Sequence, residues 1–170
     1  MNDQKVVVLM GSASDVPFAY RVGDFFEKER IPVKYEYRVS SAHKTPEKLL
    51  GELKAYEEAG DHIIYITIAG LSDALSGVVA GFSSYPVIAC SPDAEKHGWA
   101  KIFSSTMTPK GVTVSYVAKP ENAALMAAKI FALSNPALRR EIEVYMRRVR
   151  EAVEKADNSL KEKAGSQLHK

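Results

Sequence analysis

Residues 62–77, HIIYITIAGLSDALSG, contain the pattern that decides the fold. Residues 62–68 are apolar nearly throughout, which indicates a strand covered on both faces, as in a parallel sheet. Small and polar residues follow at 69–73, and they open a helix of small apolar residues. This stretch therefore predicts a strand, a turn and a helix within an α/β domain.

The same alternation of strand and helix extends in both directions from this stretch. Four further segments are predicted strands, because they are apolar or alternate between apolar and polar residues: 5–10, 33–39, 86–90 and 112–117. Apolar residues at spacings of three and four predict further helices: 16–29, 46–58 and 122–133. Strands that alternate with helices imply a doubly wound parallel sheet with helices on both faces.

Residues that favour helix starts precede two of these helices. Ser14 or Asp15 is expected to cap the first helix, and Thr45 the second. Pro46 fits the first turn of the second helix, where the missing N–H of proline costs no hydrogen bond. The connection 91–111 is long for a compact domain, so we expect it to be a functional loop or to contain a short helix.

The C-terminal part of the chain predicts one long helix over 136–160, opened by Ser134 or Asn135. Apolar residues at spacings of three and four form a narrow stripe along it: Leu138, Ile142, Tyr145, Val149, Val153, Ala156 and Leu160. The stripe can cover either a neighbouring subunit or the helix's own domain. The expected domain organisation is one domain at 1–170, with its core at 5–133 and a disordered tail at 164–170.

The composition argues against several classes of protein. The formal net charge is only +2, and no basic stripe with interleaved aromatic residues is present, so nucleic acid is not an expected partner. No apolar run is long enough to span a membrane, and no signal peptide is apparent. Cys90 is the one cysteine and has no partner for an intrachain disulfide, which fits a cytoplasmic protein.

Three turns of small and hydroxyl-bearing residues follow predicted strands: GSASD at 11–15, SSAHK at 40–44 and AGLSD at 69–73. In an open parallel sheet, ligands bind at the edge where the carboxyl ends of the strands lie. Each turn precedes a helix, whose free N–H groups and partial positive charge attract anions. Lys44 adds a cation, and Asp15 can accept hydrogen bonds from sugar hydroxyls. Together these features predict a pocket for a phosphorylated small molecule.

Each turn taken alone also fits an ordinary helix cap, and none has the spacing of a P-loop or of a dinucleotide-binding GxGxxG turn. His43 lies in this cluster, and histidine can exchange protons near neutral pH. The pattern alone supports equally a catalytic role for His43 and a position as an ordinary turn residue. The other histidines, His62, His97 and His169, are expected at structural or exposed positions or in the tail. No residue spacing predicts a metal site, and Cys90 is expected to be a small buried hydrophobe.

Five segments, in this order, resemble the PurE family, the phosphoribosylaminoimidazole carboxylases of purine biosynthesis: MGSASD, SSAHKTPEKL, AGLSDALSG, YPVIACSP and PENAALMAAKIFAL. The resemblance runs from about Val6 to Leu133. It implies a three-layer αβα, flavodoxin-like fold with a long C-terminal helix. It also implies a homo-oligomer, either a tetramer or an octamer, whose C-terminal helices reach onto neighbouring subunits. No metal, biotin or ATP is implied.

The family has two branches, which differ in the turn after the third strand. One branch adds CO2 directly to C4 of 5-aminoimidazole ribonucleotide (AIR). The other moves the carboxylate of N5-carboxyaminoimidazole ribonucleotide (N5-CAIR), and both yield 4-carboxyaminoimidazole ribonucleotide (CAIR). AGLSDALSG at 69–77 is closer to the Ala-Gly-Arg-Ser-Asn-Ala-Leu-Ser-Gly turn of the CO2-using branch. Leu71 and Asp73 depart from that pattern, as does FSSTMTPKG at 103–111, which includes Met107.

The resemblance implies that His43 is the catalytic base and that CO2 or bicarbonate is the co-substrate. The residues implied to bind the substrate are Gly11, Ser12, Ser14, Asp15, Ser41, Ala42, Lys44, Ala69, Gly70, Leu71, Ser72 and Asp73. Ser12, Ser41 and Lys44 would hold the 5′-phosphate. Asp15 would hold the ribose, and the third turn the CO2. N5-CAIR mutase activity is the alternative within the family, and a non-catalytic flavin- or nucleotide-binding module is the alternative from another class.

Overall fold

The computed structural model describes residues 4–92 and 94–167 of the chain. Its middle layer is a five-stranded parallel sheet with the strand order β2-β1-β3-β4-β5. The strands are β1 (Gln4–Met10), β2 (Lys34–Val39), β3 (His62–Ile68), β4 (Val87–Ala89) and β5 (Ser115–Tyr116). The strand order reverses between β1 and β3, so this is a doubly wound, flavodoxin-like sheet, as predicted.

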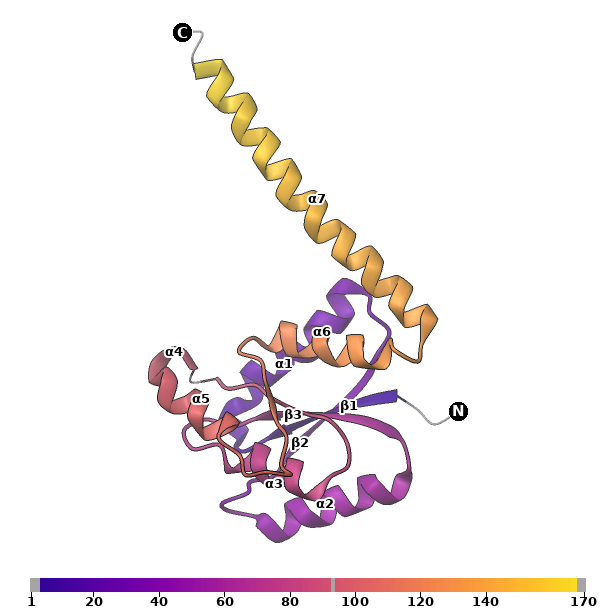
Figure 1. Cartoon of the computed structure of the whole chain (residues 1–170), viewed down its shortest axis with the longest axis vertical. Helices are drawn as coiled ribbons and strands as arrows, with labels where there is room; N and C mark the ends of the chain where they lie inside the picture. The colour runs from indigo at the N-terminus through magenta and orange to yellow at the C-terminus, as the bar shows by residue number, and fades with distance from the viewer. Residues whose placement is uncertain (1–3, 93, 168–170) are drawn as a thin grey trace.

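Helices cover both faces of the sheet (Figure 1). They are α1 (Val16–Glu29), α2 (Pro46–Ala59), α3 (Ala74–Phe82), α4 (Ala94–His97), α5 (Trp99–Thr106), α6 (Pro120–Phe131) and α7 (Pro136–Gln167), with a 3-10 turn, η1 (Ala13–Asp15), before α1. Successive side chains of β1 point to opposite faces, so Val6 and Val8 pack with α1 and α6, whereas Val7 and Leu9 pack with α2 and α3. All four side chains are fully buried. The predicted three-layer αβα class is confirmed.

The connection 91–111 contains the short helices α4 and α5, so the helical alternative is the one the structure adopts. The side chains of Lys101 and Ser105 on α5 are buried, whereas Trp99 and Phe103 are exposed. The strand predicted over 112–117 is shorter than expected and is limited to β5. The strand β5 is short because it lies at the edge of the sheet, where β4 is its one partner among the described strands.

The first turns of α1 and α2 use different side-chain contacts from those predicted. Asp15 is the N-cap residue of α1, one of the two predicted, and Ser12 caps the preceding turn η1, because Ser14 N–H donates to Ser12 Oγ at 3.4 Å. The turn η1 runs directly into α1, so Asp15 itself has a helical conformation (φ −84°, ψ −10°) and its side chain makes no cap bond. Thr45 is the N-cap residue of α2, as predicted, but its side chain also makes no cap hydrogen bond. Pro46 begins α2, as predicted.

Helix α7 packs on the domain through its first turns and then leaves it (Figure 1). Asn135 caps the helix as predicted, because its Oδ1 accepts a hydrogen bond from Leu138 N–H at 3.1 Å. The Leu138 side chain is buried in the core beside α1 and α6. Further along the apolar stripe, Val153 and Leu160 are 67% and 66% exposed. The first part of the stripe therefore packs on its own domain, and the later part is uncovered in the single chain.

The described part of α7 ends at Gln167, beyond the predicted end at residue 160. Residues 164–167, expected to be disordered, are thus helical, and 168–170 lie outside the described residues. The lysine, glutamate and alanine residues directly after Leu160 have high helix propensity, which favours continuation of the helix past the predicted end. Within the described ranges, the structure contains no helix with both the length and the apolar character that a bilayer span requires.

Candidate active site

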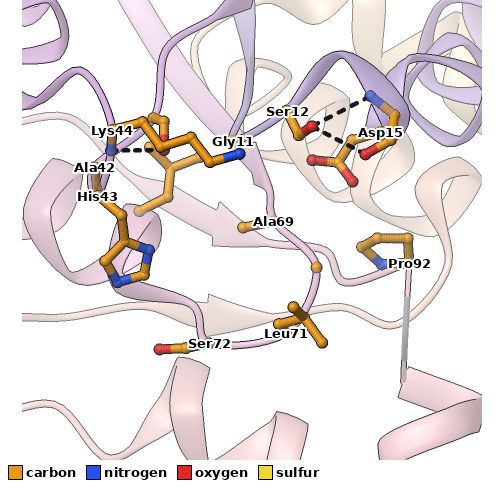
Figure 2. A pocket seen from close by; sticks show the side chains of 14 residues that line it. Gly11, Ser12, Asp15, Ala42, His43, Lys44, Ala69, Leu71, Ser72 and Pro92 are labelled. Carbon is orange, nitrogen blue, oxygen red and sulfur yellow. Dashed lines mark hydrogen bonds between the residues drawn. The ribbon is translucent and has the colours of Figure 1, made fainter.

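A cavity of about 590 Å³ is formed where the turns after β1, β2 and β3 meet at the carboxyl edge of the sheet (Figure 2). All the residues predicted to act in catalysis or to bind substrate line this cavity, with the exception of Asp73. Leu75 and Pro92 also line it, and neither was predicted. The expected meeting of the three turns at one edge is therefore confirmed, because parallel strands place their carboxyl ends together.

The turn after β1 brings two hydroxyls and a carboxylate to the cavity. Gly11 N–H donates to the Ile68 carbonyl oxygen at 2.8 Å, which joins the first turn to the base of the third. Ser14 Oγ donates to Ser12 Oγ at 3.0 Å, so the Ser12 oxygen acts as an acceptor within the turn. The Ser12 hydroxyl proton can then be donated to a ligand. Asp15 is 7% exposed and lies at the cavity wall beside Ser12 (Figure 2).

The turn after β2 is closed by reciprocal hydrogen bonds between Ser41 and Thr45. Thr45 N–H donates to the Ser41 carbonyl oxygen at 2.9 Å, and Ser41 N–H donates to Thr45 Oγ1 at 3.0 Å. Lys44 N–H donates to Ser41 Oγ at 3.1 Å. The Thr45 hydroxyl is therefore engaged in the turn, which explains why Thr45, the N-cap residue of α2, makes no side-chain cap hydrogen bond. These bonds fix the backbone from which His43 and Lys44 project.

His43 and Lys44 are both exposed at the rim of the cavity. Figure 2 shows the His43 imidazole projecting from its turn, while the Lys44 side chain extends toward Gly11. Within residues 4–92 and 94–167, no protein group hydrogen-bonds to the imidazole, so both of its ring nitrogens are accessible to a ligand. The ammonium and the serine hydroxyls together favour the binding of an anion such as a phosphate.

The turn after β3 has one face toward the cavity and one toward the protein interior. Leu71 is 71% exposed and has a left-handed backbone conformation, with φ of +54°. Asp73 is 5% exposed, and its carboxylate accepts hydrogen bonds from Ser76 N–H at 3.0 Å and from Ser76 Oγ and Ser105 Oγ at 2.6 Å each. Asp73 is thus the N-cap of α3, and its side chain is not among those that line the cavity. Its charge is directed away from the cavity.

Helix α5 hydrogen-bonds to the third turn, a contact that the sequence alone did not predict. Lys101 is 1% exposed, and its Nζ donates to the Leu71 carbonyl oxygen at 2.6 Å. Asp73 N–H donates to Ser104 Oγ at 2.6 Å. Lys101 and Ser105 are four residues apart and share a helix face, but this spacing becomes informative only once 99–106 is known to be helical.

The remaining candidate groups lie outside the cavity. Cys90 is buried, and burial raises the pKa of its thiol to about 12, so the thiol stays protonated at neutral pH and is a small hydrophobe, as predicted. His62 and His97 are exposed and do not line the cavity, and His169 lies outside the described residues. No cluster of three or more His, Cys, Asp or Glu suited to a metal ion occurs in the described part of the chain.

The fold is that of the doubly wound α/β class, and the cavity has a size and a lining suited to a small molecule. The cavity lies at the topological switch point of the sheet, and its lining combines hydroxyls, an ammonium, a carboxylate and an imidazole with apolar side chains. Comparison with known proteins narrows the class. Residues 5–152 match the family described as AIR carboxylase, so the chain belongs to the AIR carboxylase, or PurE, family.

Individual relatives agree with this assignment. The chain is 40% identical over 157 residues to a phosphoribosylaminoimidazole carboxylase from Archaeoglobus fulgidus, a match that covers 92% of this chain and 85% of the relative. It is 39% identical over 156 residues to the protein of the same name from Treponema denticola, which covers 92% of this chain and 97% of the relative. The crystal structure of Treponema denticola PurE superposes with a TM-score of 0.87 at 38% identity, covering 93% and 99% of the two chains.

Proposed function

We propose that this protein is a cytoplasmic AIR carboxylase, which joins CO2 to C4 of AIR and forms CAIR for purine biosynthesis. One observation carries the proposal: His43 lies at the rim of the cavity whose wall includes residues 69–72 of the AGLSDALSG turn. The cavity thus combines a proton carrier with the turn that resembles the CO2-using branch of the family. The names of the Archaeoglobus fulgidus and Treponema denticola relatives support the same activity.

The proposed reaction needs one base and no activated carboxyl donor. The aminoimidazole ring of AIR is electron-rich, and its C4 attacks the carbon of CO2 as an enamine does. A C–C bond forms, and C4 becomes tetrahedral, carrying both a hydrogen and the new carboxylate. His43 then accepts the C4 proton on a ring nitrogen, the C–H electron pair returns to the ring, and aromaticity is restored. Because His43 is exposed, solvent can take up the proton afterwards.

The remaining lining residues suit the other parts of the substrate. Ser12, Ser41 and Lys44 provide hydroxyl and ammonium donors for the 5′-phosphate. Asp15 provides acceptors for the ribose hydroxyls. Leu71 adds an apolar side chain to the wall, which suits a small neutral molecule such as CO2. Since CO2 is itself an electrophile and the ring a nucleophile, the proposed route calls for no metal, biotin or ATP.

A paired substrate assay tests this proposal against the mutase alternative. The protein is incubated with AIR and ¹³C-bicarbonate, and separately with unlabelled N5-CAIR in the presence of ¹³C-bicarbonate. We expect rapid formation of labelled CAIR from AIR, because the carboxyl carbon comes from solution. We also expect CAIR made from N5-CAIR to carry the label, because N5-CAIR must first decompose to AIR.

The opposite labelling pattern would identify a mutase. Rapid formation of unlabelled CAIR from N5-CAIR, together with no turnover of AIR, would contradict the proposal. A purified protein that carries a bound flavin or nucleotide and turns over neither substrate would instead support the non-catalytic binding module. A colourless protein that carboxylates AIR excludes that module.

A homo-oligomer, either a tetramer or an octamer, is part of this proposal, because the later part of the α7 stripe is exposed in the single chain. The double substitution Val153→Asp and Leu160→Asp is expected to reduce the mass measured by light scattering, since it places charges on the apolar stripe. Asn158→Asp introduces one negative charge, against two in the double variant, on another face of α7 and should leave the mass unchanged. An unchanged mass in the double variant would show that the stripe does not form the subunit contact.

A further inference from the structure

Lys101 is a buried lysine that the proposed reaction does not use. It lies on α5 and is 1% exposed, and its ammonium donates to the Leu71 carbonyl oxygen at 2.6 Å. Leu71 has a φ of +54°, a left-handed conformation in which a Cβ is strained. We propose that Lys101 is a positioning residue that holds the third turn, residues 69–73, in the conformation that shapes the cavity wall.

The Leu71 side chain does not fix this conformation by packing, because it is 71% exposed. A residue with a Cβ leaves the left-handed region unless its surroundings determine the conformation. The hydrogen bond from Lys101 is charge-assisted and partly buried, which makes it one of the stronger contacts available to a backbone carbonyl. A buried ammonium also requires hydrogen-bond acceptors, so Lys101 favours the turn conformation that presents the Leu71 carbonyl to it.

Two further hydrogen bonds tie the end of the same turn to α5. Asp73 N–H donates to Ser104 Oγ, and Ser105 Oγ donates to the Asp73 carboxylate, each at 2.6 Å. These bonds fix the residue at which α3 begins, whereas Lys101 acts on Leu71 in the middle of the turn. Release of Lys101 therefore leaves the end of the turn attached and frees the cavity-lining part, so its effect is distinct from a general loosening of α5.

The catalytic consequence of this inference rests on the proposed function. If the third turn holds the CO2 or the carboxylate, a turn that samples other conformations reduces the fraction of protein that is competent to bind. The apparent KM then rises in inverse proportion to that fraction, whereas kcat at saturation changes less. The conformational consequence does not depend on the proposed function, because backbone exchange of the turn can be measured without a substrate.

The test replaces Lys101 by methionine, which keeps a long apolar stem and removes the ammonium. Hydrogen–deuterium exchange of residues 69–73 should become about tenfold faster, while exchange in β1 and β3 stays unchanged. The apparent KM for AIR should rise by about tenfold, with a smaller change in kcat. Lys110→Met is the matched control, because Lys110 is an exposed lysine of the same connection. It should alter neither quantity.

A second substitution, Leu71→Gly, separates positioning from general stability. Glycine adopts a positive φ without steric cost, so Lys101→Met should speed exchange much less in a Leu71→Gly background than in the wild-type background. Equal effects in the two backgrounds overturn the inference. A Lys101→Met protein that melts earlier but keeps wild-type exchange at 69–73 and a wild-type KM also overturns it, because the role would then be structural only.

The remaining outcomes are equally decisive. If Lys101→Met alone does not fold, recovery of folding by Leu71→Gly supports the inference, and continued failure of the double variant contradicts it. If the wild-type protein does not turn over AIR, the proposed function fails, but the exchange comparison still decides whether Lys101 positions the turn. The two proposals therefore fail by different measurements.

Discussion

Replacing His43 by asparagine is expected to lower the turnover of AIR by a factor of about 10² to 10⁴, the usual contribution of a general base. Asparagine retains a polar side chain of similar reach but has no nitrogen that accepts the C4 proton. The rate is measured at saturating AIR and bicarbonate, so that a change in affinity does not contribute. His62→Asn is the matched control, because His62 is exposed and does not line the cavity.

Ligand binding should survive the His43 substitution. The hydrogen bonds that close the turn involve Ser41, Thr45 and the backbone of Lys44, and the His43 imidazole takes no part in them. Affinity for CAIR, measured by calorimetry, should therefore stay within about tenfold of the wild-type value. Loss of binding together with turnover would assign His43 to ligand recognition. Wild-type turnover would exclude it as the base.

Replacing Asp73 by alanine is expected to lower the free energy of unfolding by about 3 kcal/mol. The substitution removes the N-cap of α3 and also the acceptor for the hydroxyls of Ser76 and Ser105, which are 0% and 1% exposed. A buried polar group left without a partner costs more than the loss of an average hydrogen bond. Denaturant unfolding at one fixed protein concentration measures the change, because the stability of an oligomer depends on concentration.

Two further variants show whether the Asp73 carboxylate is the cause. Asp73→Asn should destabilise by roughly 1 kcal/mol, because its carbonyl oxygen can still cap α3 and the serine hydroxyls can rotate to meet the amide. Asp24→Ala, at an exposed position on α1, should change the free energy of unfolding by less than about 0.5 kcal/mol. A loss in Asp73→Ala no larger than that in Asp24→Ala would contradict the assigned role of Asp73.

Much of the candidate site could be derived from the sequence because its parts are local. Each of the three turns follows an apolar strand, and parallel strands must place their carboxyl ends at one edge. The positions of Ser12, His43 and Lys44 around one cavity therefore follow once the strands are recognised. Asp73 follows β3 in the same way and was predicted with them, but its side chain caps α3 and is not part of the cavity lining. The direction of this short side chain depends on the helix that it caps.

The support of the third turn could not be derived in this way. Leu71 is a poor candidate for a left-handed conformation by residue type, and Lys101 is a poor candidate for burial. The left-handed conformation of Leu71 and the burial of Lys101 explain one another, because the buried ammonium donates to the carbonyl that the left-handed turn presents. A short helix in the connection 91–111 was one of two expectations, but neither of them pairs Lys101 with Leu71, which lies 30 residues earlier in the chain.

The sequence by itself determined the order of strands and helices, the two-sided burial of the central strands and the three polar turns. These features depend on periodicity and on residue preferences within a few positions of one another. Only the tertiary structure decided that α5 hydrogen-bonds to the third turn, that the Asp73 side chain caps α3, and that the later part of α7 is uncovered. Each of these depends on how segments distant in the chain pack together, and local periodicity carries no information about such contacts.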